Sequence, residues 1–91
     1  MVLHLGGEWG APHRHVLAIV DLHTADSPDT RAFLRRAREQ NVLVVVPEGE
    51  PRSAVITVDD AGMRRVYLSP ISAMALKGRG DSAGFMERGA V

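Results

Sequence analysis

The sequence predicts a small α+β domain, in which a mostly antiparallel sheet carries one main helix. Two observations lead to this prediction. Five short runs rich in Val, Ile and Leu are separated by Gly, Pro and Asp turn signals, as strands are. One further stretch combines a helix-start signal with an apolar stripe of helical period. The predicted order is β-β-α-β-β-β followed by a short C-terminal helix, and 91 residues suffice for one such domain.

Two strands are predicted before the helix. Residues 2–5 form a short run with leucines on one side, and two glycines end it. Residues 10–15 are polar and contain Gly and Pro, so we expect a turn there. Residues 16–22 are rich in β-branched residues and bounded by turn signals, which is typical of a buried strand.

The main helix is predicted to begin at Ser27 and Pro28. A serine hydroxyl accepts a hydrogen bond from a free backbone N–H at the N-cap, and proline suits the first helical position because no N–H is needed there. Asn41 suits the left-handed residue that ends a helix. Between these ends, an apolar stripe lies opposite an arginine stripe, which comprises Arg31, Arg35 and Arg38.

Three strands are predicted after the helix. Residues 42–46 form a run of Val and Leu that Pro47 stops, and residues 53–58 form a second apolar run after a tight connection. We expect these two runs to pair as a hairpin. Another Asp- and Gly-containing turn then leads into the last strand, at residues 63–68.

The domain is predicted to span residues 1–77. Ser69 and Pro70 can start a short helix that reaches the end of this range. Residues 78–91 contain four glycines and little apolar content, so we expect a flexible C-terminal tail.

The strands carry more apolar surface than one helix covers. Residues 16–22, 42–46 and 53–58 are apolar on both alternating faces, which indicates that both faces of the sheet are covered. The second cover comes either from other copies of the chain or from the two ends, residues 1–12 and 70–77, folding over that face. We favour self-association, because a domain of this size is marginally stable alone.

Charge and composition exclude several classes of protein. Eleven basic residues balance eleven acidic ones, so a strongly basic tail is not the main basis of function. The absence of cysteine excludes a disulfide framework, a thiolate zinc site and a cysteine nucleophile. No apolar run approaches the ~18 residues of a membrane span, and the N-terminus lacks the layout of a signal peptide. We therefore expect a cytoplasmic protein without membrane contact.

We predict no enzyme activity, and no catalytic residue, cofactor, metal or small-molecule substrate. His13 and His15 form a metal-like pair, but a zinc site needs three or four convergent ligands. Four serines occupy positions typical of helix caps and strand ends rather than of nucleophiles: Ser27, Ser53, Ser69 and Ser72. A histidine-based metal protein or enzyme stays open as a third hypothesis.

Arginine is the unusual component of the sequence. Ten of the eleven basic residues are arginine, and they cluster on the predicted helix and at Arg64 and Arg65. The planar guanidinium group binds phosphate with two donors, which lysine cannot do. An arginine stripe is also the usual solvated face of a helix. In an oligomer each modest basic spot would be repeated, and phosphate affinity grows with the number of contacts.

Five segments, in this order and spacing, resemble the RemA/RemB family of extracellular-matrix (biofilm) regulators, and its RemB-like branch most. They are Leu3-His4-Leu5-Gly6-Gly7, Val16-Leu17-Ala18-Ile19-Val20-Asp21, Arg31-x-Phe33-Leu34 with Ala37-Arg38-Glu39, Pro51-Arg52-Ser53, and Val66-Tyr67-Leu68-Ser69-Pro70-Ile71-Ser72. The resemblance covers residues 1–77. It implies a bacterial DNA-binding transcription regulator with a LytTR-like fold, whose copies close into a ring that presents arginines to DNA.

The resemblance implies particular DNA-contacting residues. Where RemA-type members have an arginine just before the second strand, this chain has His15 beside Arg14. Where they have two arginines after a loop glycine, this chain has Glu50 and Pro51, and only Arg52 lies nearby. The predicted DNA-binding residues are therefore Arg14, His15 and Arg52, followed by Arg64 and Arg65.

The predicted partners are further copies of the chain and double-stranded DNA, bound mainly through its phosphates. Glu48 and Glu50 depart from the family pattern, because carboxylates in that loop repel phosphate. An oligomeric scaffold, or a module that binds a protein partner and has lost DNA contact, is therefore the alternative function.

Overall fold

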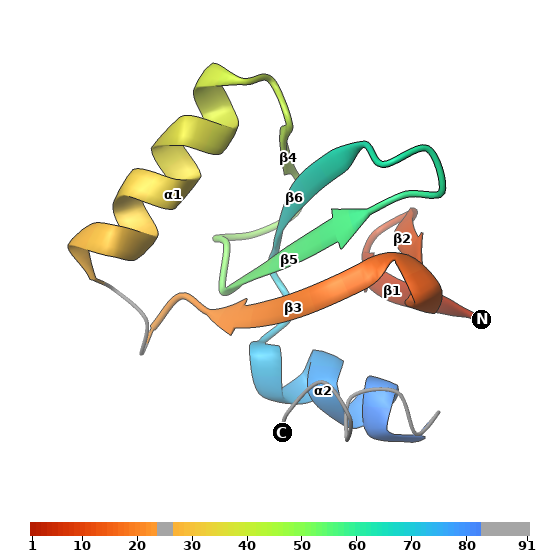
Figure 1. Cartoon of the computed structure of the whole chain (residues 1–91). Helices are drawn as coiled ribbons and strands as arrows, with labels where there is room; N and C mark the ends of the chain where they lie inside the picture. Colours follow the sequence, from red (N-terminus) through yellow and green to blue (C-terminus); the bar gives the residue numbers. More distant parts are fainter. Residues whose placement is uncertain (24–26, 83–91) are drawn as a thin grey trace.

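A four-stranded mixed sheet forms the centre of the molecule (Figure 1). The computed structural model describes residues 1–23 and 27–82. The strand order is β3-β5-β6-β4, and a separate hairpin pairs β1 with β2. The strands are β1 (Val2–Gly6), β2 (Trp9–Pro12), β3 (Val16–Asp21), β4 (Leu43–Val45), β5 (Ser53–Val58) and β6 (Arg64–Ser69). The predicted α+β class and the mostly antiparallel sheet are confirmed.

The predicted hairpin between residues 42–46 and 53–58 is wrong. Strand β4 lies at the edge of the sheet and pairs in parallel with β6, while β5 lies between β3 and β6. Helix α1 (Pro28–Glu39) carries the chain from β3 at one edge to β4 at the other, so β5 and β6 fill the middle. Strands β3 and β4 therefore run parallel to each other, and consecutive parallel strands need a crossover connection, which α1 provides. The burial of the strands agrees with this strand order, since Val66 in the inner strand β6 is fully buried and Val45 in the edge strand β4 is exposed.

The predicted turn at residues 10–15 is also wrong in its first part. Residues Trp9–Pro12 form strand β2, in which Ala11 pairs with Leu3 and is buried. Gly and Pro are depleted in strands, so this segment carries no strand signal in the sequence. A single 3₁₀ turn, η1 (His13–His15), then leads into β3.

Helix α1 begins and ends as the sequence predicts. The backbone N–H of Thr30 donates to the hydroxyl of Ser27 over 3.2 Å, and Pro28 occupies the first turn. Asn41 follows the helix with a φ of 60°, in the left-handed region. The apolar stripe of α1 packs on one face of the sheet, in a cluster built on Ala37, Ala54, Val66 and Leu68.

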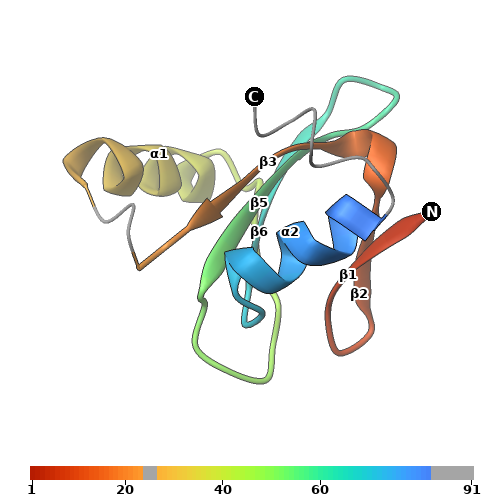
Figure 2. The ribbon, with the colours of Figure 1, turned by 90° about the horizontal axis from the view of Figure 1, so that it is seen from below.

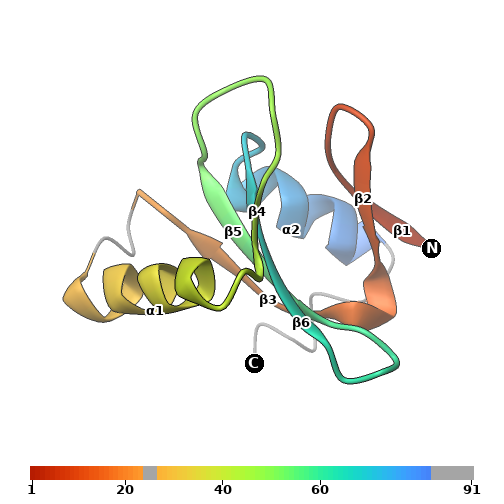
Figure 3. The same cartoon turned by 90° about the horizontal axis from the view of Figure 1, so that it is seen from above.

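The two ends of the chain cover the other face of the sheet. Figures 2 and 3, seen from opposite sides, place the β1–β2 hairpin and helix α2 (Ala73–Ser82) on one face and α1 on the other. The buried cluster on this second face contains Leu3, Leu5, Ala11, Val16, Ile19, Val46, Val55, Ala73 and Leu76. The expectation that other copies must cover this face is therefore wrong, and the alternative in which both ends fold over it is confirmed.

Helix α2 extends beyond the predicted domain end. It runs to Ser82, so it includes the first residues of the segment expected to be a flexible tail. Residues 83–91, the remainder of that segment, lie outside the described residues. The flexibility of the tail stays a prediction.

Two buried serines connect the sheet to both ends of the chain. The Ser69 hydroxyl donates to the carbonyl of Leu5 in β1 over 2.6 Å and accepts from the N–H of Ile71 over 3.1 Å. The Ser53 hydroxyl donates to the carbonyl of Ile71 over 2.7 Å. Both serines are fully buried. These hydroxyls satisfy backbone groups where β1 and the segment before α2 meet the sheet.

The variant Ser69→Ala tests this connection. We expect it to lower the free energy of unfolding by about 1–3 kcal/mol, because a buried carbonyl loses its donor. Urea denaturation measures the loss. Met74→Ala on α2, where the side chain is 83% exposed, serves as the control and should leave stability nearly unchanged. Equal stabilities of the two variants would contradict the structural role of Ser69.

Candidate nucleic-acid interface

The five predicted contact residues lie at the two opposite ends of the four-stranded sheet. Arg14 and His15 form η1 at the start of β3, and Arg64 and Arg65 begin β6. Val58, the last residue of β5, pairs with Arg64, so these four residues share one end of the sheet. Arg52 precedes the first residue of β5. A six-residue strand spans about 17 Å, so Arg52 lies well away from the other four.

The turn between β5 and β6 shapes the first end of the sheet. A carboxylate oxygen of Asp59 accepts hydrogen bonds from the backbone N–H groups of Ala61 and Met63, each over 2.9 Å. Gly62 has a φ of 82°, which lets the chain reverse. The Asp- and Gly-containing turn predicted before the last strand is confirmed. Asp60 is left at the exposed side of this turn, facing η1.

Asp60 contacts both residues that the resemblance selects on η1. Its carboxylate accepts from the Arg14 guanidinium over 3.0 Å, and its other oxygen lies 3.3 Å from Nε2 of His15. The hydrogen bond with Arg14, and then its charge, lower the pKa of Asp60 below its usual value. The same bond raises the pKa of Arg14. Arg14 is 68% exposed, so solvent screens this pair and it adds little to stability.

Arg64 and Arg65 point to opposite faces of the sheet, because successive strand residues alternate. Arg65 shares a face with Tyr67, on the side of α2, and lies 3.6 Å from the Asp59 carboxylate. Arg64 shares a face with Val66, on the side of α1. Within the described residues Arg65 therefore has an acidic partner on its own turn, and Arg64 has no ion pair.

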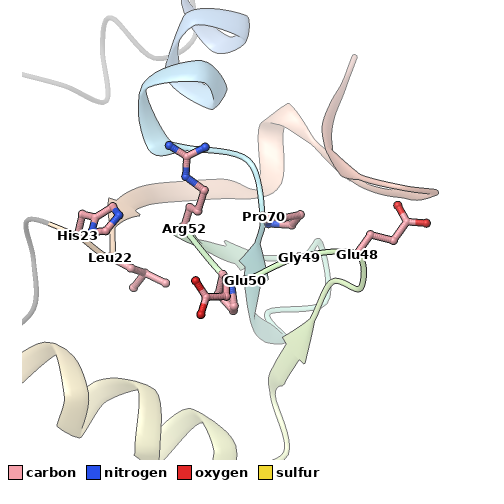
Figure 4. Close-up of a pocket in the computed structure, with 8 residues that line it drawn as sticks. Leu22, His23, Glu48, Gly49, Glu50, Arg52 and Pro70 are labelled. Carbon is pink, nitrogen blue, oxygen red and sulfur yellow. The ribbon is translucent and has the colours of Figure 1, made fainter.

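Arg52 lies at the other end of the sheet, in a different electrostatic setting. It lines a shallow cavity of about 590 Å³ together with Leu22, His23, Glu48, Gly49, Glu50, Pro51 and Pro70. Figure 4 shows Arg52 and Glu50 pointing to opposite sides of the loop, with Glu48 pointing away from both. One cation and two carboxylates give this loop a net negative charge, so it attracts phosphate poorly.

Comparison with known proteins places the chain in a family. Residues 2–79 match the family model described as RemA-like, Extracellular matrix regulatory protein A-like. The chain belongs to the RemA-like family. It is also 33% identical over 81 residues to Extracellular matrix regulatory protein B of Bacillus subtilis (strain 168), which covers 87% of this chain and 89% of that protein. The predicted family and its RemB-like branch are confirmed, and the family is one of extracellular-matrix regulators.

Two residues important to the site of this RemA-like chain were missed by sequence reasoning. Asp60 was assigned only to a turn. It lies a few residues before Arg64 and Arg65, and it neutralises Arg14, which is 46 positions away in the sequence. Arg36 was counted only among the arginines of the predicted helix, although it lines a small hollow together with Arg64. The adjacent acidic residues shortly before Arg64 and Arg65 are a sequence signal that points to Asp60. Only the fold reveals that Arg36 lines a hollow together with Arg64.

The described residues also bear on metal and membrane chemistry. No three His, Asp or Glu side chains among residues 1–23 and 27–82 lie close enough together to hold a metal ion. His13 and His15 share the single turn of η1, and the second of them faces Asp60. None of the described helices is long and apolar enough to cross a membrane.

Proposed function

We propose that this RemA-like protein is a DNA-binding transcription regulator of extracellular-matrix genes, which acts as a ring-shaped homo-oligomer and binds mainly DNA phosphates. Membership of a family of matrix regulators supports the regulatory part. The observation that carries DNA binding is the convergence of Arg14 and His15 on one exposed carboxylate. A carboxylate and a phosphate both offer a guanidinium group a pair of anionic oxygens.

The contact with Asp60 supports a competition between carboxylate and phosphate. The two donors already converge on a pair of oxygens, so a phosphate entering from solvent meets donors in a suitable arrangement. Asp60 is 73% exposed and is held by screened contacts, so its displacement costs little. The affinity for phosphate is lower than it would be at free donors, because Asp60 must leave first.

The free edges of the sheet support assembly into a ring. Within the described residues, β3 and β4 each pair with one neighbour only, and they lie at opposite edges. Leu17 on β3 is 61% exposed and Val45 on β4 is 56% exposed. An apolar strand edge is a template for pairing with another chain. Two different edges on opposite sides suit head-to-tail contacts, which close into rings.

A ring would also compensate for the neutral charge of the chain. Eleven basic residues balance eleven acidic ones, so a single copy has no excess of positive charge. Repeating one phosphate-binding end around a ring multiplies the contacts without changing the net charge of each copy. Each phosphate neutralised contributes a slope of about −0.9 in the dependence of log affinity on log salt concentration.

The alternative function is an oligomeric scaffold or partner-binding module without DNA contact. Glu48 and Glu50 favour it, because they make the loop around Arg52 acidic. The two functions share the ring and differ in affinity for DNA. A salt titration of binding to a duplex therefore discriminates between them.

The salt dependence of DNA binding tests the proposal. Fluorescence anisotropy with a long labelled duplex should show micromolar or tighter binding at low salt. The affinity should fall by a log–log slope of several units, about 0.9 for each phosphate contacted. Absence of binding at low salt would contradict DNA contact and select the scaffold.

Native mass spectrometry tests the ring. We expect a single closed assembly with a mass that is a whole-number multiple of 9.9 kDa, unchanged over a wide range of concentration. A closed ring has no free edges left to recruit further copies. A single 9.9 kDa species at all concentrations, or an open ladder of sizes, would contradict it.

The variant Asp60→Asn tests the competition at Arg14 and His15. We expect it to tighten DNA binding several-fold, because the donors no longer compete with a charged carboxylate. Glu8→Gln makes the same charge change in the β1–β2 turn, at the other end of the molecule, and serves as the control. Equal effects of both variants would show that only net charge matters.

A further inference from the structure

Four of the described arginines differ in whether an acid neutralises them. Arg14 and Arg65 each contact an aspartate of the β5–β6 turn. Arg36 and Arg64 form no ion pair among the described residues. They come from α1 and β6, and together they line one hollow of about 240 Å³.

The fold brings this second pair together for clear reasons. Strand alternation turns Arg64 toward the α1 face, because it shares the side of Val66. The N–H of Val66 donates to the carbonyl of Val42 over 2.9 Å, which holds the start of β6 beside the segment that follows α1. Arg36 lies in the last turn of α1, next to this segment. Arg36 and Arg64 therefore line one hollow from separate elements.

The lining of the hollow suits an anion. Phe33, Ala37 and Val42 are its apolar lining, and Gln40 is its third polar side chain after the two arginines. No acidic residue lines it. Arg36, Gln40 and Arg64 are all exposed, so solvent screens the repulsion between the two like charges without removing it. A bound anion removes the repulsion and gains a charge-assisted hydrogen bond from each arginine.

The size and position of the hollow narrow the kind of anion. A typical small-molecule pocket measures about 300–1,000 Å³, so 240 Å³ favours one ionic group over a larger ligand. The hollow lies at the same end of the sheet as Arg14, because Arg64 pairs with Val58 directly before the turn that carries Asp60. The two places lie on either side of the β5–β6 turn, at one end of the sheet.

We infer that Arg36 and Arg64, assisted by Gln40, form a phosphate-binding site for the DNA backbone on the α1 face. This inference rests on the proposed function and names the part of the surface that carries its affinity. Arg36 and Arg64 are ready to bind, whereas Arg14 and Arg65 must first leave their aspartates. The acidic loop around Arg52 plays no part in this contact.

Adjacent residues of β6 supply a matched test. Arg64→Gln and Arg65→Gln make the same charge change one position apart, but only the first removes an arginine without an acidic partner. Binding of the full chain to a duplex is measured by anisotropy over a range of salt. Arg36→Gln and Arg64→Gln should each weaken binding about tenfold or more and reduce the salt slope by about 1. Arg65→Gln and Arg52→Gln should each change affinity less than twofold.

Two further variants guard against indirect effects. Arg36→Lys keeps the charge but loses the planar fork, so it should bind more weakly than the wild type and more tightly than Arg36→Gln. Unchanged urea denaturation midpoints show that the glutamine variants stay folded. Gln40→Ala keeps every charge, so it tests the contribution of a neutral residue of the hollow to DNA binding.

The outcomes separate the inference from the proposed function. If the wild type binds DNA and Arg64→Gln weakens binding no more than Arg65→Gln, the phosphate site is wrong while DNA binding stands. If the wild type fails to bind DNA at low salt, both are wrong. Selective loss with Arg36→Gln and Arg64→Gln supports both.

Discussion

The need to cover both faces of one four-stranded sheet within a short chain governs this molecule. Helix α1 covers one face, and the β1–β2 hairpin with α2 covers the other (Figures 1 and 2). Both ends of the chain are thereby used for burial, and the Ser69 hydroxyl joins them through the Leu5 carbonyl. The chain itself buries the apolar residues at the centre of the sheet. The edges and ends of the sheet are the parts that we propose to interact with other molecules.

The arginines at the two ends of the sheet lie in different electrostatic surroundings. Arg64 and Arg65 are neighbours in sequence, yet strand alternation sends one to the α1 face and the other to an aspartate. Asp60 holds Arg14 and His15 in the same way. The loop near Arg52 is acidic. In the proposed function, phosphate affinity therefore depends less on how many arginines the chain has than on which of them lack an acidic partner.

Local signals were sufficient for much of the fold, and long-range pairing was not. The N-cap at Ser27 and the left-handed Asn41 were predictable because each depends on neighbouring residues only. The parallel pairing of β4 with β6 joins strands separated by a complete strand and two loops, so no local signal predicts it. Among the candidate site residues, Arg14 and His15 are neighbours in sequence, but their partner Asp60 is distant in sequence. The convergence of Arg36 with Arg64 equally depends on tertiary contacts.

A crystal structure of the full chain bound to a short duplex would show which arginines hold the DNA backbone. We expect a phosphate oxygen within hydrogen-bond distance of both Arg36 and Arg64, with the duplex passing the end of the sheet that carries the β5–β6 turn. A duplex seated instead on the loop around Arg52, with no phosphate between Arg36 and Arg64, would contradict it.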